Sequence, residues 1–494
     1  MARTTLANVE NKYPQLEKRA RKITTINLPE DGTITQLNIS DSFIAKFCDE
    51  IRYIEGLERW AVYHNTKGWL LDEGLVCLNE MWRDTLNELE RDTPSGLSPH
   101  KSKQHQYKRQ GSVRKNSVNA GFSAILSLAQ RDKQIRISSD LVDNNPDLLA
   151  CNSGLIDLTN GTLFAHSQNK VIVKRLPVEY DVTAKCPRWF QFLREVLVDQ
   201  EVIDYAQKVF GYCLTGRTSL QQMWLLIGSG GNGKSTFLNT LQNLLGPDFG
   251  QQTPESVLMG KPVTGGSSGE LMRLKGIRTA VLTETAYDQH LNETRVKALV
   301  SSDVIAARAI YSDFQQFTPE AKFFLATNHL PVVKGSDFGI WRRLVVIQFR
   351  QQFDKTADSD LGAQLNSELP GILNWALEGA QLFYAAGKKI AVPEQLTSWT
   401  SDYRKDQDVI ANFLSYCTTD AATERVGATI LYEQYTNWCK ETAITAMTQG
   451  EFGGRLKSNG RYEHRRHGKD NRFCYKGLRL STAEEKAKLS GRAE

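Results

Sequence analysis

The sequence of 494 residues contains only eight cysteines, and no two of them form a C-x-x-C pair. Disulfide-rich domains and zinc ribbons need closely spaced cysteines, so neither class explains this chain. No apolar run approaches the roughly 18 residues that a membrane-spanning helix needs, and the first residues lack the apolar core of a signal peptide. We therefore expect a cytosolic protein without a membrane partner.

The chain also lacks a strong charge of either sign, because 61 lysines and arginines face 56 aspartates and glutamates. A net charge of +5 does not by itself indicate a nucleic-acid-binding protein. The distribution of charge is more informative, since basic residues gather in two stretches, 100–116 and 455–479. The length predicts about three domains.

The most specific motif lies in residues 223–245. Met223–Ile227 is a short apolar run typical of a buried strand, and apolar residues recur at helical spacing from Phe237 to Leu245. The turn between them matches G-x-x-x-x-G-K-[ST], a loop that binds phosphates. We predict nucleotide contacts from all of its residues: Gly228, Ser229, Gly230, Gly231, Asn232, Gly233, Lys234, Ser235 and Thr236.

The residue types of this loop have a physical role. Glycines let successive backbone N–H groups point at a polyphosphate, and the following helix adds positive potential at its N-terminus. Lys234 would neutralise the terminal phosphates, and Ser235 would bind Mg²⁺, which prefers oxygen ligands. The motif alone predicts only phosphate binding, which kinases, GTPases and motor proteins share.

Two further apolar runs each end in a polar residue that suits such a site. Ala280–Thr283 is followed by Glu284, and Phe323–Thr327 is followed by Asn328. Ligands of open α/β sheets lie at the carboxyl ends of the strands, so we expect Lys234, Glu284 and Asn328 to converge on one γ-phosphate. Glu284 would hold Mg²⁺ or orient the attacking water, and Asn328 would position that water.

Two adjacent arginines, Arg342 and Arg343, stand before the apolar run Leu344–Ile347. Such pairs are usually surface charge. Beside an ATP site they are also candidates for an arginine finger, which stabilises the charge of the transition state.

Residues 93–116 begin with turn formers and continue with basic residues and no acid. This composition predicts a loop or mobile crossing. The stretch is either a solvated surface or a contact for a phosphate backbone, and its sequence does not separate the two. Farther along, residues 145–161 predict a small β element and residues 187–216 predict helical structure.

Beyond Pro393 the pattern predicts three helices followed by two short strands, which is compatible with a winged helix. Between Arg455 and Arg479, nine basic residues face two acids. This patch is either a solvated surface or a face for nucleic acid, and we favour the second. The predicted DNA contacts are Arg455, Lys457, Arg465, Arg466 and Lys469.

Taken in order, these motifs resemble the helicase part of the primase-helicases of phages, plasmids and poxviruses, whose ATPase belongs to helicase superfamily 3. The Walker A and Walker B motifs are matched by GSGGNGKSTFLNTL and RTAVLTETA, and the sensor motif by LATNHLP. The superfamily's extra motif is matched by KALVSSDVIAARAIYSDFQQFTP, and its arginine motif by GSDFGIWRRLVVIQF. The helicase-associated region is similar to NSGLIDLTNG, VKRLPVEYDVTAKCPRW and GYCLTG.

The resemblance implies an ATP- and Mg²⁺-dependent DNA helicase that assembles as a ring, commonly a hexamer, and moves 3′ to 5′ on single-stranded DNA. A phage- or plasmid-encoded member would act in the bacterial cytoplasm. Glu284 would be the Walker B acid, with Ser235 as the second Mg²⁺ ligand, and Asn328 would be the sensor. Because the site would be shared between subunits, isolated monomers should hydrolyse ATP poorly.

Further residues take roles only through this resemblance. Arg342 and Arg343 would divide their duties between the subunit's own site and its neighbour's. A hairpin facing the pore would carry basic and aromatic residues, which suit a charged, stacking single strand. The candidates, of which any could touch DNA, are Lys297, Arg308 and Tyr311.

The overall prediction is an α/β P-loop ATPase of the AAA+-like superfamily 3 helicase type. A mixed α/β N-terminal region would occupy residues 1–145 and a helicase-associated segment residues 146–205. The ATPase would occupy residues 206–390 and a winged-helix DNA-binding domain residues 400–494.

The chain departs from the family pattern in two places. Ala286 and Tyr287 follow Glu284 where many relatives carry further acids, so either Asp288 substitutes or Glu284 works alone. Only about 145 residues precede the matched region, without a zinc motif or a convincing pair of metal-binding acids. We therefore expect no priming activity from this chain and a possible separate primase as partner.

Two other functions stay open. A DNA-bound ATP switch, such as a loader or origin-recognition factor, would use the same winged helix without unwinding DNA. A small-molecule kinase would share the phosphate loop, but it would not explain the paired arginines or the basic C-terminal region.

Overall fold

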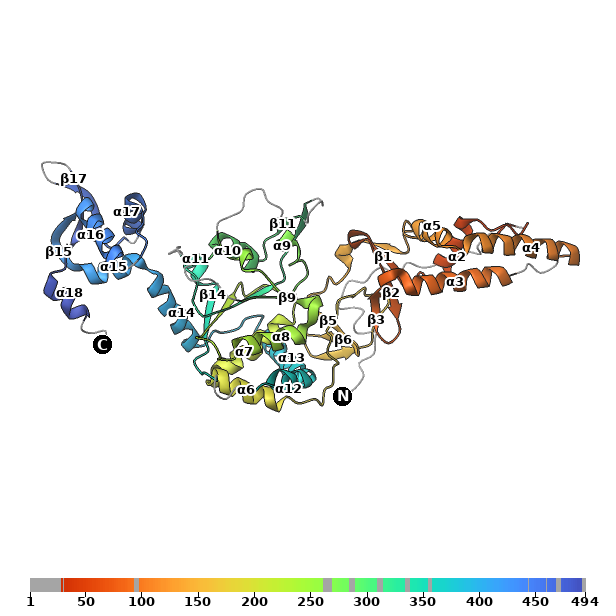
Figure 1. Cartoon of the computed structure of the whole chain (residues 1–494), viewed down its shortest axis with the longest axis horizontal. Helices are drawn as coiled ribbons and strands as arrows, with labels where there is room; N and C mark the ends of the chain where they lie inside the picture. The colour runs from red at the N-terminus through yellow and green to blue at the C-terminus, as the bar shows by residue number, and fades with distance from the viewer. Residues whose placement is uncertain are drawn as a thin grey trace.

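The computed structural model describes residues 28–29, 31–92, 97–260, 269–283, 289–308, 314–333, 338–353, 358–442, 444–458, 460–467 and 472–490. In Figure 1 three groups of elements follow one another along the longest axis: an N-terminal group, a central sheet with its helices, and a C-terminal group. In this part of the chain, no helix is both long and apolar enough to cross a membrane.

The central group is built on a five-stranded sheet whose neighbouring strands all run parallel. Its order is β14-β8-β13-β10-β9. The strands are β8 (Met223–Ile227), β9 (Gly250–Gln252), β10 (Thr279–Thr283), β13 (Lys322–Thr327) and β14 (Leu344–Gln348). The inner strands are almost wholly buried and mainly apolar because helices cover both faces of a parallel sheet. The strands that the sequence predicts at residues 223–227, 280–283 and 323–327 are confirmed, and the apolar run 344–347 also lies in a strand.

Helices pack around this sheet: α6 (Pro187–Leu197), α7 (Gln200–Cys213), α8 (Lys234–Phe249), α10 (Glu293–Val300), α12 (Leu361–Ser367), α13 (Leu369–Ala385) and α14 (Glu394–Gln407). The helical prediction for residues 187–216 is thus confirmed as two helices. Between α7 and α13 the backbones nearly touch, since a Cβ on Gly211 would lie 2.0 Å from the nitrogen of Ala380. Glycine is required there because no side chain fits.

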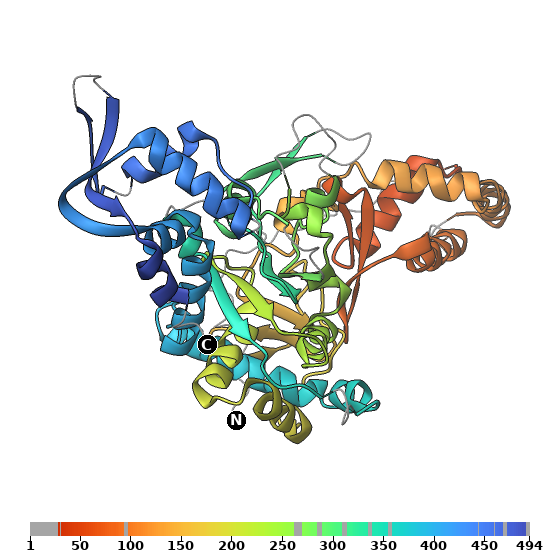
Figure 2. The ribbon, with the colours of Figure 1, turned by 60° about the vertical axis from the view of Figure 1, so that its left-hand side comes forward.

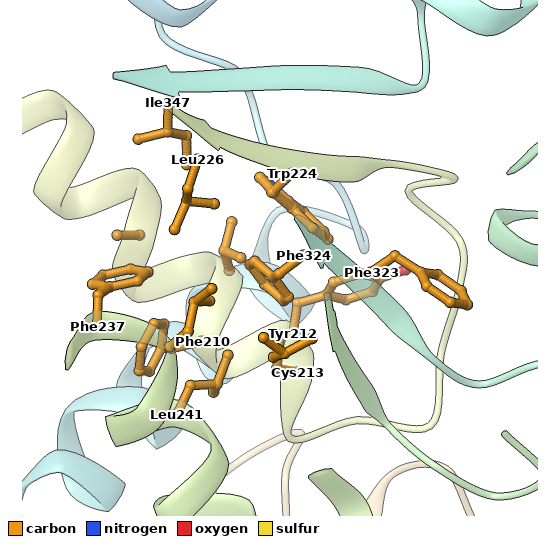
Figure 3. Close-up of a cluster of buried hydrophobic side chains, with 14 of the residues drawn as sticks. Phe210, Tyr212, Cys213, Trp224, Leu226, Phe237, Leu241, Phe323, Phe324 and Ile347 are labelled. Atoms are coloured by element: carbon orange, nitrogen blue, oxygen red, sulfur yellow. The ribbon is translucent and has the colours of Figure 1, made fainter. Parts of the chain in front are cut away.

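Aromatic side chains fill the space between the sheet and these helices (Figure 3). The rings of Trp224 and Phe324, on neighbouring strands, stack with centroids 5.0 Å apart. Phe210 of α7 meets Phe237 of α8 edge to face at 5.1 Å. The helix after the phosphate-binding motif is therefore fixed to the sheet by its apolar face, as the spacing of its residues predicts.

A small antiparallel sheet precedes the central group and consists of β5 (Leu148–Cys151), β6 (Gly154–Asp157) and β7 (Thr162–Phe164). The β element predicted at residues 145–161 is confirmed. Asp147 joins it to the helices, because its carboxylate accepts hydrogen bonds from Arg217 Nε at 2.6 Å and from the Tyr384 hydroxyl at 2.5 Å.

The N-terminal group pairs a four-stranded sheet of order β3-β2-β1-β4 with four helices. Its elements are α2 (Gln36–Phe47), β1 (Ile51–Ile54), β2 (Arg59–His64), β3 (Gly68–Leu71), α3 (Val76–Arg91), α4 (Pro99–Asn116), α5 (Asn119–Ala129) and β4 (Arg136–Ile137). The side chains of Trp60 and Trp69 are buried and belong to the hydrophobic core of this group.

The prediction of a loop at residues 93–116 is wrong for most of this stretch, because residues 99–116 form the helix α4. Pro99 stands at the start of the helix, where its missing N–H costs nothing. Lysine, arginine and glutamine are good helix formers, so a basic polar run does not exclude a helix. His105, Arg109 and Val113 recur at helical spacing on the buried face, and two of the three are polar. The apolar periodicity that would have revealed the helix is therefore missing.

The C-terminal group contains the three helices and two strands expected from the sequence. They are α15 (Val409–Cys417), α16 (Ala428–Glu441), α17 (Gln449–Ser458), β16 (Glu463–His467) and β17 (Arg472–Leu480). A further strand, β15 (Thr418–Gly427), and a last helix, α18 (Ala483–Ser490), are not predicted from the sequence. Strand β17 lies between β15 and β16, and in Figure 2 the β16–β17 hairpin projects away from the helices.

Candidate functional site

The glycine-rich turn joins the carboxyl end of β8 to the start of α8. Gly230, Gly231 and Gly233 have φ angles of 103°, 58° and 88°, which only glycine adopts easily. A Cβ on Gly233 would lie 2.7 Å from Cγ1 of Val196, and one on Gly228 would lie 2.6 Å from the oxygen of Phe349. The turn therefore needs glycine both for its conformation and for its close contacts.

Lys234 is the first residue of α8, and only 7% of its surface is exposed. Its ammonium donates hydrogen bonds to Gly228 O at 2.7 Å, to Asn232 Oδ1 at 2.9 Å and to Asn328 Oδ1 at 3.2 Å. Burial lowers the pKa of Lys234 because the charged form loses solvation. Among the described residues, all three of its hydrogen-bond partners are neutral. A buried cation of this kind suits an anionic ligand.

Asn328 follows β13, so the structure brings it to Lys234 across 94 residues of sequence, as expected from the strand ends. Asn232 fixes the turn from the other side, because its Nδ2 donates to Phe349 O at 3.2 Å. Glu284, the third predicted member of this set, lies outside the described residues, as do Ala286, Tyr287 and Asp288. Thr283, at the end of β10, lines the same cavity as Lys234.

A cavity of about 690 Å³ opens at this edge of the sheet. The turn and α8 supply Gly230, Gly231, Asn232, Gly233, Lys234, Ser235 and Thr236 to its lining. Ser229 stands next to the lining, where its hydroxyl accepts a hydrogen bond from Gln352 Nε2 at 2.7 Å. Apolar side chains also line it, namely Phe192, Val196, Phe353 and Leu361. The lining therefore combines the polar groups of the turn with apolar side chains.

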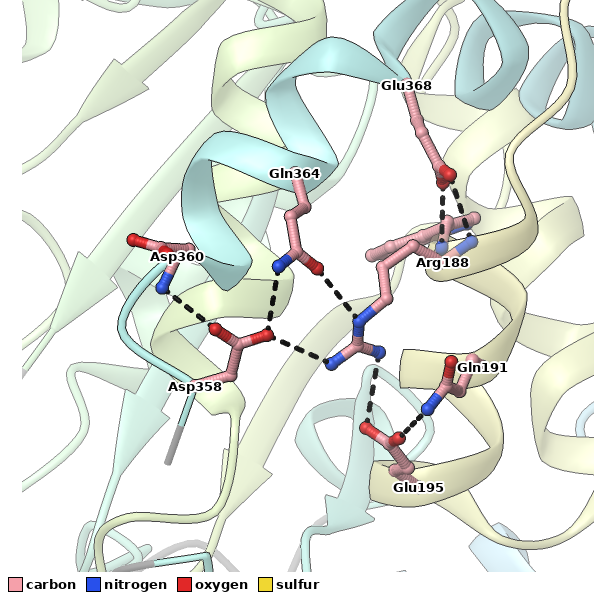
Figure 4. Close-up of polar contacts among 8 residues, drawn as sticks. Arg188, Gln191, Glu195, Asp358, Asp360, Gln364 and Glu368 are labelled. Atoms are coloured by element: carbon pink, nitrogen blue, oxygen red, sulfur yellow. Dashed lines mark hydrogen bonds and ion pairs between the residues drawn. The ribbon is translucent and has the colours of Figure 1, made fainter. Parts of the chain in front are cut away.

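Three charged residues that line this cavity are not predicted from the sequence: Arg188, Glu195 and Asp358. Arg188 and Glu195 belong to α6, and Asp358 precedes α12. Figure 4 shows Arg188 at the centre of this cluster. Its Nε donates to Gln364 Oε1 at 3.2 Å, and its Nη1 donates to Glu195 at 3.4 Å. Its Nη2 lies 4.0 Å from Asp358. Arg188 is thus a cation at the cavity wall that is already held by two carboxylates.

Glu368 fixes the start of α6 against α13. Its two carboxylate oxygens accept hydrogen bonds from the backbone nitrogens of Arg188 at 3.0 Å and Trp189 at 2.9 Å. A carboxylate at a helix N-terminus satisfies free N–H groups and matches the helix dipole. In the sequence, one feature points to a role for Arg188: it lies in the segment VKRLPVEYDVTAKCPRW, which resembles the helicase-associated region.

Arg342 and Arg343 lie at the other edge of the sheet from the cavity. Leu344, the first residue of β14, pairs with Met223, and Met223 donates its N–H to Arg343 O at 2.7 Å. Five residues of strand, about 15 Å, separate that edge from the glycine turn. Neither arginine lines the cavity of this chain, and their division between the chain's own site and its neighbour's stays a prediction. Arg343 Nη1 donates to Gly339 O at 2.6 Å, and Arg342 Nη2 donates to Gln221 at 3.0 Å.

A two-stranded hairpin, β11 (Ile305–Ala307) and β12 (Gln315–Phe317), holds part of the predicted pore motif. The Arg308 guanidinium lies 4.9 Å from the ring centre of Phe314, which is 64% exposed and was missed in the sequence analysis. Lys297 belongs to α10. Tyr311 lies outside the described residues.

Two of the basic residues of the C-terminal group, Arg466 and Lys457, lie against the ring of Phe473. The Phe473 ring stacks on His464 with centroids 4.7 Å apart, and the Arg466 guanidinium lies 4.8 Å from its centre. Lys457 approaches the same ring to 6.0 Å. Acids of the same elements bind two other predicted contacts: Arg465 pairs with Glu463 at 2.6 Å, and Arg455 pairs with Glu451 at 3.1 Å. Lys469 lies outside the described residues.

Three parts of the chain match known protein families. Residues 41–198 match the family described as D5 N terminal like, and residues 405–474 match the family described as Poxvirus D5 protein-like. These two matches make the chain similar to the D5-type primase-helicases at both of its ends. Residues 226–343, which include the glycine turn and Asn328, match a family of unknown function.

Among related proteins, "Putative helicase L207/L206" of Acanthamoeba polyphaga mimivirus is 27% identical over 323 residues, covering 60% of this chain and 33% of that protein. "Putative helicase 121R" of Invertebrate iridescent virus 3 is 25% identical, covering 61% of this chain and 36% of that protein. "Putative primase C962R" of African swine fever virus is 23% identical, covering 59% and 32%. The chain thus spans about a third of the length of these relatives.

Among solved structures, the apo C-terminal region of NrS-1, residues 305–718 in its own numbering, is 10% identical to this chain with a TM-score of 0.48. The similarity covers 89% of this chain and 98% of that one.

Proposed function

We propose that this chain is the ATP-driven motor of a DNA helicase, with a P-loop ATPase of the superfamily 3 type at its centre. The observation that carries the proposal is the buried Lys234, which has only neutral hydrogen-bond partners among the described residues and lines a cavity at the carboxyl edge of a parallel sheet. Ligands of α/β sheets bind at this edge. A polyphosphate would be the negatively charged partner that the Lys234 ammonium lacks among the described residues.

The residues of the cavity divide naturally between the parts of a nucleotide. Lys234 and the N–H groups of the glycine turn would hold the phosphates. Asn328, whose side chain already accepts a hydrogen bond from Lys234, would position the attacking water. The apolar side chains of Phe192, Val196 and Phe353 would contact the base.

A magnesium ion fits the oxygen donors of this site. Ser235 lines the cavity directly after Lys234, and Glu284 follows the strand that ends beside it. We propose both as ligands, in company with phosphate oxygens and water. Bound Mg²⁺ would supply neutralisation of the charge that develops on the phosphates.

We further propose that the chain works as a ring, commonly a hexamer, on single-stranded DNA. Arg342 and Arg343 lie too far from the chain's own cavity, so in our proposal they reach the site of the neighbouring subunit. Arg308 and Phe314 on the hairpin, together with Lys297 of α10, would contact the strand by charge and stacking. Residues 400–494 would form a winged helix whose β16–β17 hairpin contacts duplex DNA.

The test is ATP hydrolysis and strand displacement by the assembled chain. We expect hydrolysis to rise with single-stranded DNA, to disappear in Lys234→Ala and to drive displacement of a labelled strand with 3′ to 5′ polarity. Hydrolysis without displacement at any salt concentration would sink the helicase assignment.

A loader or origin-recognition factor is the second candidate, because the basic C-terminal hairpin would suit site recognition. It predicts a specific duplex footprint that is lost when residues 400–494 are removed, with ATP controlling assembly rather than unwinding. A footprint without sequence preference would remove this candidate.

A further inference from the structure

The helix α4 carries positive charge for which the proposed motor has no use. Two of its basic residues hold the fold. Arg109 is buried, and its Nη1 binds the carboxylate of Asp92 at 3.1 Å. Lys108 pairs with Asp31 at 3.0 Å, next to the first described residues. These pairs fasten α4 to the rest of the N-terminal group.

The other basic residues of α4 have no such task. Lys101, Lys103, Arg114 and Lys115 are all exposed. Among the described residues, the ion pairs of α4 are those of Lys108 and Arg109. The helix carries no acid, so these four cations repel one another and destabilise the fold. An anionic partner would remove this repulsion.

An aromatic ring stands among these cations. Tyr107 is 79% exposed, more than any other large hydrophobic or aromatic side chain of the described residues. Lys103, Tyr107, Gln110 and Arg114 follow one another at spacings of four, three and four residues, so they share one face of the helix.

This face borders a hollow of about 950 Å³ between α3 and α4. From α4 the hollow is lined by Tyr107, Gln110 and Arg114, and from α3 by Arg83 and Asn87. Glu90 is the one acid in its lining. In Figure 1 the two helices lie side by side and extend away from the central sheet, so the hollow is not part of the nucleotide cavity.

We propose that this surface, the arm face (Arg83, Lys103, Tyr107, Gln110 and Arg114), binds single-stranded nucleic acid. Its cations would pair with successive phosphates, and an unstacked base would lie on the Tyr107 ring. A single strand fits better than a duplex because a base that is paired inside a helix offers no face for stacking. Gln110 would donate hydrogen bonds to a base edge or a phosphate. The arm face would thus be a strand contact separate from the central hairpin and from the C-terminal patch.

The first experiment measures the affinity of the full chain for fluorescent oligo(dT) across a salt series. We expect Lys103→Glu with Arg114→Glu to weaken binding about tenfold at low salt and to reduce the salt slope by about 1.4, which corresponds to two lost phosphate contacts. Tyr107→Ala should weaken binding about fivefold, while Tyr107→Phe should preserve it because the ring remains. All of these side chains are exposed, and thermal melting will verify that the variants fold.

The matched control is Lys67→Glu with Lys389→Glu, which makes the same charge change at exposed positions away from the arm face. If the control lowers affinity as much as the arm variant, the effect is general electrostatics and the proposal fails. It also fails if the arm variant binds oligo(dT) as the unchanged chain does. Equal losses for duplex and single-stranded probes would overturn the choice of a single strand.

The second experiment places the strand directly. Oligo(dT) carrying 5-iododeoxyuridine is irradiated with the chain, and cross-linked peptides are identified by mass spectrometry. We expect a cross-link at Tyr107, whereas an acidic protein as the true partner predicts none. Both experiments are repeated in a Lys234→Ala background, in which hydrolysis is absent but the arm face is unchanged. If the unchanged chain hydrolyses ATP but gives no cross-link at Tyr107, only the arm face is contradicted. If it gives the cross-link but does not hydrolyse ATP, only the proposed motor is contradicted.

Discussion

The cavity beside Lys234 and the C-terminal patch both collect positive charge, but they hold it in opposite ways. Lys234 is buried and fixed by three neutral oxygens, so its charge is desolvated before any ligand arrives. The Arg465 side chain is 81% exposed and shares its charge with Glu463. A buried cation interacts strongly with an anion, whereas an exposed one is screened by water and salt.

This difference separates two kinds of function. Removing the buried charge should abolish a reaction, and removing the exposed charge should weaken binding by an amount that depends on salt. Comparing the two regions therefore tests whether the cavity is the chemical site and the patch only a binding surface.

The largest expected effect comes from Lys234→Ala. We expect ATP hydrolysis to fall on the order of 100-fold or more, because a buried charge-assisted contact is worth about 3 kcal/mol. Thermal stability without nucleotide should be unchanged or higher, since the variant no longer buries a cation among neutral partners. The control is Lys389→Ala, an exposed lysine. A stable Lys234→Ala protein with normal hydrolysis would end the assignment of the cavity.

The next effect comes from two glycines of the same turn. Gly233→Ala should reduce stability by about 1–3 kcal/mol and nucleotide affinity with it, because a Cβ would lie 2.7 Å from Val196 in a backbone with φ of 88°. Gly230→Ala has the same strain in the backbone, but a Cβ there meets no atom within 4 Å. We therefore expect a smaller loss. Equal unfolding curves and equal nucleotide affinities for the two variants would contradict the described turn.

A third effect tests whether Arg188 belongs to the site or only to the fold. Arg188→Ala leaves Glu195 and Asp358 without their shared cation at the cavity wall. We expect nucleotide affinity to fall about tenfold, with the largest loss at low salt, where the two carboxylates repel phosphate most strongly. Arg194→Ala on the same helix is the control, since Arg194 is exposed and does not line the cavity. Equal nucleotide titrations for both variants would assign Arg188 to structure alone.

The smallest expected effect is that of Arg465→Ala with Arg466→Ala. Binding of duplex DNA should weaken about three- to tenfold, and the salt slope should fall by about 2, because each lost phosphate contact contributes about 0.9. Hydrolysis without DNA should not change. Filter binding across a salt series measures both quantities, with Lys388→Ala and Lys389→Ala as the charge-matched control. Unchanged affinity and slope would retire the patch as a DNA contact.

Several elements were predictable because their signals are local. The run Met223–Ile227, the glycine turn and the apolar face of α8 all lie within 23 residues, and each follows from neighbouring residues alone. Asn328 was also predicted near Lys234, because parallel strands place their carboxyl ends at one edge of a sheet. For the same reason, the opposite position of Arg342 and Arg343 could have been inferred, since both precede a strand of that sheet.

Other features have no local signal. Helix α4 has a polar buried face, and β15 (Thr418–Gly427) has no clear alternation of apolar residues, so periodicity revealed neither. Arg188 and Asp358 meet at the cavity although they are 170 residues apart in the sequence. Sequence spacing carries no information on such a pair.

The sequence by itself determined the glycine turn and the strands on either side of the site, because these depend on residues close together in the chain. Only the tertiary structure decided that Arg188 joins the cavity and that Tyr107 stands exposed among cations on a helix. Those outcomes depend on strand order and helix packing, which bring together, or separate, residues that are far apart in the sequence.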